Sequence, residues 1–282
     1  MKVVRDTCIA GKVIDVTVKV PSGNHTSKRA ARTCITSEKV KKNNERIAVK
    51  ELARLFNANF TSNDTHVTLT YRGAEPTQKQ AVAAIKKFLR KLRAEYKKQG
   101  KELKYIAVTE YLNKRIHHHI VINGQDAALL TRLWQEGFVN LKSLDESGDY
   151  TQLAEYFIKE SRKTFRYEES QHKRRYSCSR NLIRPKVKRE MVSEKQLWED
   201  PNPIPGYYIP QDSVRRYKHP ITELEHLEYR MVAINEPRKY KVWPRGRQVD
   251  AKENFRVNYR EKQEAFIDDD IQAILGYGKE SE

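Results

Sequence analysis

Two short segments, residues 105–110 and 116–122, are rich in β-branched residues and are separated by only five residues. Segments of this composition and length are typical of β-strands. A connection this short joins antiparallel strands, because parallel strands need a long crossover. Segments with helical periodicity precede and follow the pair. We therefore expect an α+β fold with an antiparallel sheet flanked by helices, rather than a doubly wound parallel sheet.

The periodicity of apolar residues predicts the other elements of this fold. Spacings of three and four predict helices, and alternation predicts strands. Pro76 suits the first turn of a helix and Gly100 its end. The expected helices cover residues 43–56, 76–100, 126–137 and 150–162, and the expected further strands cover residues 64–71, 138–141 and 176–182.

The expected helix over residues 76–100 is basic on the face opposite its apolar stripe. The basic residues on this face are Lys86, Lys87, Arg90, Arg93 and Lys97. Two interpretations stay open: a face exposed to solvent, or a surface in contact with DNA.

The charge of the chain indicates a polyanionic partner. The 282 residues include 55 Lys and Arg against 37 Asp and Glu, a formal net charge of +18. Such an excess favours nucleic acid or an acidic membrane surface. No segment resembles a signal peptide or a transmembrane helix, so we expect nucleic acid as partner and no membrane. Three widely spaced cysteines form no CxxC pair, which favours the reducing cytoplasm over a disulfide framework.

Composition also divides the chain into four expected parts. We expect a basic arm or hairpin over residues 1–40 and the catalytic α+β domain over 41–198. The proline-rich segment 199–235 is expected to wrap on that domain, and residues 236–282 to form a peripheral or disordered tail.

Three consecutive histidines occupy one of the two central strands. Side chains alternate along a strand, so His117 and His119 share one face while His118 points to the apolar face. Glu110 ends the preceding strand, and a hairpin turn over residues 111–115 brings it close to both histidines. Two imidazoles and a carboxylate suit a divalent metal. The alternative is a chance cluster of surface histidines, or an inward histidine that is only hydrogen-bonded.

A tyrosine and a lysine lie one turn apart in the last expected helix. At 100° per residue, Tyr156 and Lys159 are about 60° apart on the helix surface. A nearby cation favours the phenolate form of tyrosine, which is a nucleophile. The pattern alone is weak, because helix tyrosines are usually core residues with an exposed hydroxyl. Tyr150 lies at the expected helix start, near the cap candidate Asp149 and about 120° away from Tyr156.

Basic residues with interleaved aromatic residues continue beyond this helix. Basic side chains neutralise phosphates and aromatic faces stack on unpaired bases, a combination suited to single-stranded nucleic acid. The candidates for this contact are Arg162, Lys163, Arg174, Arg175 and Arg180.

The segment 68–71, the strand with His117 and His119, and the pair Tyr156 and Lys159 follow one another in a fixed order. In this order they resemble the three motifs of the HUH rolling-circle replication initiators, most closely the replication-associated proteins of bacterial phages and related mobile elements. The resemblance covers roughly residues 40–235. It implies a ferredoxin-like, RRM-like sheet. One departure is His118, where the family usually has a bulky apolar residue.

The resemblance also implies a function. His117, His119 and Glu110 would bind Mg²⁺ or Mn²⁺, and Tyr156, assisted by Lys159, would nick single-stranded DNA or an origin hairpin through a 5′-phosphotyrosine. No P-loop pattern occurs, so the expected partners include a host helicase and polymerase in the cytoplasm of a bacterial cell. Two alternatives are a single-strand transposase or relaxase of the same superfamily, and a non-catalytic protein that binds single-stranded nucleic acid.

Overall fold

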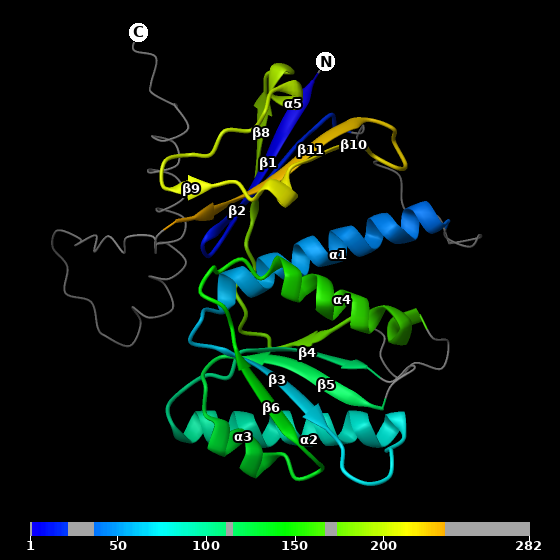
Figure 1. The fold of residues 1–282 in the computed structure, drawn as a ribbon, viewed down its shortest axis with the longest axis vertical. Coiled ribbons are helices and arrows are strands. Elements are labelled where there is room, and N and C mark those ends of the chain that lie inside the picture. The colour runs from blue at the N-terminus through cyan, green and yellow to red at the C-terminus, as the bar shows by residue number, and fades with distance from the viewer. Residues whose placement is uncertain (1, 22–36, 111–114, 167–173, 235–282) are drawn as a thin grey trace, which may run out of the picture.

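The computed structural model describes residues 2–21, 37–110, 115–166 and 174–234, and for residues 162–166 it describes the backbone only. The expected tail over residues 236–282 and most of the turn over 111–115 lie outside these ranges. Helices and sheets stack in layers along the longest axis of the molecule (Figure 1). Within the described ranges, no helix has the length and apolar character that a membrane span requires.

The central sheet has the topology expected for a ferredoxin-like domain. Its strand order is β6-β3-β5-β4-β7, and every neighbouring pair is antiparallel. The βαββαβ order of β3-α2-β4-β5-α3-β6 is that of the ferredoxin-like fold. The α+β expectation is therefore confirmed. The elements are β3 (Thr65–Thr70), α2 (Gln78–Lys98), β4 (Tyr105–Glu110), β5 (His117–Ile122), α3 (Ala127–Leu133), β6 (Val139–Ser143) and β7 (Ser177–Cys178).

The helices cover opposite faces of this sheet (Figure 1). On one face α2 and α3 form an apolar core with Ile116, Ile120 and Ile122. On the other face α1 (Glu38–Asn59) and α4 (Thr151–Arg166) form a second core that includes Val121. The alternation of side chains along β5 thus divides its residues between two cores.

Local sequence explains where the helices begin. Thr77 caps α2, and Gln80 completes a capping box with it, so the helix starts at Gln78 rather than at Pro76 as the sequence analysis expected. Ser37 caps α1. At the start of α4, a carboxylate oxygen of Asp149 accepts a hydrogen bond from the backbone nitrogen of Thr151 at 3.1 Å.

A second antiparallel sheet was not predicted. Its order is β10-β11-β2-β1-β8, and β9 also pairs with β11. It joins the first strands of the chain to strands almost 200 residues later, and α5 packs on one of its faces. Its elements are β1 (Val3–Ala10), β2 (Val13–Lys19), β8 (Val187–Val192), α5 (Lys195–Trp198), β9 (Tyr207–Tyr208), η1 (Gln211–Ser213), β10 (Arg215–Lys218) and β11 (Glu225–Ala233).

The expected strand over residues 176–182 is shorter than predicted. Only Ser177–Cys178 pair with β4, and the chain then leaves the central sheet. The next strand, Val187–Val192, pairs with β1 in the second sheet. Pro185 lies between the two and has no N–H for a sheet hydrogen bond, which is consistent with the break.

The glycine turn of the β1–β2 hairpin packs against the end of α1. Gly11 has a φ of +59°, and a Cβ built on it would lie 2.0 Å from the carbonyl oxygen of Asn57. Only glycine fits both requirements. The turn therefore anchors the second sheet to α1.

The contact between the second sheet and α1 is polar. Lys50 Nζ lies 3.2 Å from a carboxylate oxygen of Asp15 and 3.3 Å from one of Glu228, while Arg54 Nε lies 2.8 Å from Asp15. Arg46 also pairs with Glu228. Burial raises the pKa of the Glu228 carboxyl, but the charges of Lys50 and Arg46 outweigh this effect and hold the pKa below its usual value.

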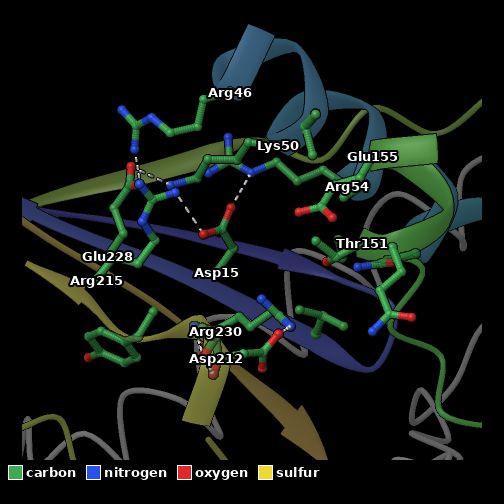
Figure 2. Close-up of a pocket in the computed structure, with 18 residues that line it drawn as sticks. Asp15, Arg46, Lys50, Arg54, Thr151, Glu155, Asp212, Arg215, Glu228 and Arg230 are labelled. Carbon is green, nitrogen blue, oxygen red and sulfur yellow. Dashed lines mark hydrogen bonds and ion pairs between the residues drawn. The ribbon is translucent and has the colours of Figure 1, made fainter. Parts of the chain in front are cut away.

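These ion pairs line a cavity of about 240 Å³ between α1, the start of α4 and the second sheet (Figure 2). Arg230 closes another part of its wall by pairing with Asp149 at 2.6 Å and Asp212 at 3.0 Å. Four of the cationic side chains around the cavity are paired within it. We therefore interpret the cavity as part of a structural interface.

Candidate metal centre and nucleophile

The histidine strand has the predicted register. His117 and His119 lie on the face of β5 toward α4, and His118 lies on the other face, fully buried. The strand register places Glu110 directly opposite His117. Ligand atoms of Glu110, His117 and His119 all lie within 4.8 Å of one another. The two central strands thus bring together the three residues that the sequence analysis named, and the cluster could hold a metal ion.

Hydrogen bonding orients the His117 ring toward the cluster. Its Nδ1 lies 2.8 Å from the carbonyl oxygen of Arg115, which can only accept, so Nδ1 carries the hydrogen. Nε2 then faces a carboxylate oxygen of Glu110 at 3.1 Å. An imidazole lone pair and a carboxylate oxygen at this distance need a proton or a cation between them. This donor arrangement fits a divalent ion.

The His119 ring is held from both sides. Its Nδ1 lies 3.2 Å from the hydroxyl of Thr68 and 3.3 Å from Nε2 of His66, both on β3. Its Nε2 lies 2.8 Å from the hydroxyl of Tyr156. The nitrogen that counts among the cluster's ligand atoms is thus also the one that contacts the tyrosine.

His66 was missed by the sequence analysis. Its ring packs on Phe157 at 5.6 Å between centroids and near Tyr156 at 6.3 Å, so it joins β3 to α4. Burial lowers the pKa of His66 to about 4, and the charge of Lys142 adds to this shift, so the ring is neutral near pH 7. The available signal was its position in the strand: His66 and Thr68 share the face that points to α4.

Tyr156 is the half-exposed residue of α4 that reaches the cluster. Burial raises the pKa of its hydroxyl to about 12, and the carboxylates of Glu160 and Glu110 add to the shift. The protein part of the site alone therefore disfavours the phenolate. Lys159 lies one turn further along α4 and is exposed.

Tyr150 belongs to the core rather than to the cluster. It is 2% exposed, and its hydroxyl donates to the carbonyl oxygen of Asp145 at 3.2 Å. Its backbone nitrogen donates to the side chain of Asn57. The two tyrosines of this helix region therefore have different surroundings.

His118 is a structural residue. Its two ring nitrogens lie 2.8 Å from the hydroxyl of Tyr71 and 2.9 Å from that of Thr109. Trp134 packs on its edge. These contacts explain how a histidine can occupy a position facing the apolar core.

The candidate residues for nucleic-acid contact are only partly described. Arg174 and Arg180 are exposed, and Arg175 is half-buried. Arg162 and Lys163 lie in the last turns of α4, but their side chains are outside the described part of the structure. The structure does not test the proposed contact.

The fold and the site together define a class: a ferredoxin-like domain with a His-His-Glu cluster that could hold a metal ion, and a tyrosine in contact with that cluster. Residues 64–165 match the family of the Replication-associated protein ORF2. The matched range runs from the start of β3 into α4 and contains the whole cluster and Tyr156. No curated protein and no solved structure is significantly similar to the chain.

The family match confirms the resemblance drawn from the three motifs. The matched segment is that of a replication-associated protein of the rolling-circle type. This family supports a role in the initiation of replication.

Proposed function

We propose that this protein nicks and rejoins single-stranded DNA at a replication origin, with Tyr156 as the nucleophile. The observation that carries the proposal is the 2.8 Å contact between the Tyr156 hydroxyl and His119, inside the His-His-Glu cluster. The nicking domain in this proposal spans residues 41–198.

His117, His119 and Glu110 would hold the ion, which we propose to be Mg²⁺ or Mn²⁺. When bound, such an ion polarises the scissile phosphate as a Lewis acid. The Arg115 carbonyl and Thr68 keep the two imidazole rings oriented toward the cluster, because each accepts a hydrogen bond from a ring Nδ1.

The proposed chemical step is an in-line displacement at phosphorus. The oxygen of Tyr156 attacks, its proton leaves to water, and the bond from phosphorus to the 3′-oxygen breaks. The products are a 5′-phosphotyrosine and a 3′-oxygen that takes up a proton, ready for extension by a polymerase. Lys159 would stabilise the negative charge that develops on the phenol oxygen.

Rejoining is the reverse step. A 3′-hydroxyl attacks the phosphotyrosine, the phosphodiester forms again and Tyr156 is released. The ester conserves the bond energy, so no ATP is required. Host helicase and polymerase would separate and extend the strands, and the reaction would take place in the bacterial cytoplasm.

The experiment that tests this proposal combines the protein, MnCl₂ and a single-stranded origin oligonucleotide. The expected product is a protein–DNA adduct that survives denaturation, forms with wild type and is absent from Tyr156→Phe. Tyr156→Phe should still bind the oligonucleotide, which shows that the variant is folded. Binding without any adduct in the wild type would favour a non-catalytic binding protein instead.

A further inference from the structure

The outer face of α2 is strongly basic, and the proposed nicking chemistry does not use it. Helix α2 contains eight basic residues and one acidic residue, Glu95. Its apolar residues, among them Phe88, Leu92 and Tyr96, are buried against the central sheet. The charges therefore lie on the side away from the core.

Helix geometry arranges these charges in a row. At 100° per residue, five basic residues fall within about 60° of arc and span about 27 Å along the helix axis. We call this set the α2 row: Lys79, Lys86, Arg90, Arg93 and Lys97. All five are exposed.

Within the described part of the chain, the α2 row lacks the acidic partners of an ordinary solvated face. Glu95 lies on another side of the helix, where it pairs with Lys98 at 2.8 Å and Arg132 at 3.5 Å. Several basic residues follow each other at spacings of three or four, for example Arg93 and Lys97. Like charges at these spacings destabilise a helix, so the sequence of α2 is unfavourable for stability and favourable for a polyanion.

We propose that the α2 row binds the phosphate backbone of duplex DNA. The exposed face of α2 has no aromatic residue, because Phe88 and Tyr96 point into the core. Single-strand binding sites use aromatic side chains to stack on bases, whereas a duplex encloses its bases and presents phosphates. Duplex DNA carries one charge per ~1.7 Å of axis, or about 16 charges over the length of the row.

Other polyanions fit this face less well. A helix that lies on a membrane surface exposes apolar residues beside its charges, and those of α2 are buried. The row also lies on the opposite side of the central sheet from α4 and the His-His-Glu cluster (Figure 1). It would therefore contact duplex DNA next to the single strand at the cluster. This contact goes beyond the proposed nicking and does not require it.

The test measures binding of a fluorescent duplex, longer than the row and of arbitrary sequence, by anisotropy at increasing salt. The row variant carries Lys86→Gln, Arg90→Gln and Lys97→Gln. The control carries Lys195→Gln, Arg215→Gln and Lys218→Gln, three exposed positions on the second sheet at the far end of the molecule (Figure 1). Both variants lose the same charge, and glutamine is as good a helix former as lysine.

The row variant should bind the duplex at least about tenfold more weakly, and its slope of log affinity against log salt should fall by about 2 to 3. The control should behave like wild type. Equal affinities and slopes in row variant and control would overturn the proposal. Loss of binding to phosphatidylserine vesicles with unchanged duplex binding would also overturn it, since it would assign the row to a membrane.

A short single strand separates this proposal from the nicking proposal. The row variant should form the covalent adduct on it at the wild-type rate, because the row lies on the other face of the sheet. An equal loss of adduct and duplex binding would place the row in the single-strand path and contradict the duplex assignment. If wild type forms no adduct but the row variant still loses duplex binding, the nicking proposal fails and the duplex proposal stands.

Discussion

The hydroxyl of Tyr156 and Nε2 of His119 lie 2.8 Å apart, across the space between α4 and the central sheet. One imidazole therefore belongs both to the cluster that could hold a metal and to the surroundings of the proposed nucleophile. This relationship explains why the pKa of Tyr156 matters. Burial raises it to about 12, so a cation near the hydroxyl is needed before the phenolate forms near neutral pH.

The first prediction concerns the histidine register. His117→Ala and His119→Ala should each weaken Mn²⁺ binding strongly and abolish adduct formation. His118→Ala should retain Mn²⁺ binding but lower the free energy of unfolding by about 2–4 kcal/mol, because it removes a buried ring bonded to Tyr71 and Thr109. Calorimetric Mn²⁺ titration and urea unfolding measure the two effects. Loss of Mn²⁺ binding in a folded His118→Ala alone would show that the assigned ligands are wrong.

The second prediction assigns His66 a positioning role toward His119. His66→Phe keeps a ring against Phe157 but removes the nitrogen that lies 3.3 Å from His119. Mn²⁺ affinity should fall by about tenfold or more, as for other residues that orient a metal ligand. His66→Gln, which restores a polar partner, should recover part of the affinity. If Phe and Gln bind Mn²⁺ as wild type does, His66 only packs.

The third prediction concerns acid stability. Burial lowers the pKa of His226 to about 4, with further contributions from the charges of His219 and Lys19. Because the folded-state pKa lies below the unfolded value of 6.5, this contribution to stability is present above pH 6.5 and is lost as the pH falls from 6.5 toward 4.

His226→Phe removes this titration and keeps the ring that stacks on His219. Between about pH 7 and about pH 5, wild type should lose about 1–2 kcal/mol more unfolding free energy than the variant. Urea unfolding at both pH values gives the difference. Equal losses in the two proteins would mean that His226 titrates normally in the folded state.

The fourth prediction separates the two tyrosines. Tyr150→Phe should still form the adduct, because the Tyr150 ring lies in the core and its hydroxyl bonds to the Asp145 carbonyl. The change should lower the unfolding free energy by about 1 kcal/mol, the contribution of one hydrogen bond. An adduct-deficient Tyr150→Phe with normal stability would favour an initiator that uses two tyrosines.

Local patterns in the sequence were sufficient for the central sheet and the cluster. Alternation placed His117 and His119 on one face and His118 on the other, and the short connection placed Glu110 opposite His117. These inferences depend on residues close in sequence, for which strand geometry leaves few choices.

The second sheet and His66 depend on contacts between distant residues. Arg5 on β1 pairs with Glu190 on β8, and nothing in either segment names its partner. His66 reaches His119 only because β3 and β5 pair in one register, with Thr68 opposite His119. A single sequence shows that each segment is a strand, but not which strands become neighbours.

The most direct test of the central claim is to identify the residue that carries the DNA. Wild type is incubated with Mn²⁺ and a single-stranded origin oligonucleotide, digested with protease and nuclease, and the modified peptide is sequenced by mass spectrometry. We predict a phosphodeoxynucleotide on Tyr156 in the peptide that includes part of α4, and no such peptide from Tyr156→Phe. A nucleotide on Tyr150 or on any other residue would contradict the account.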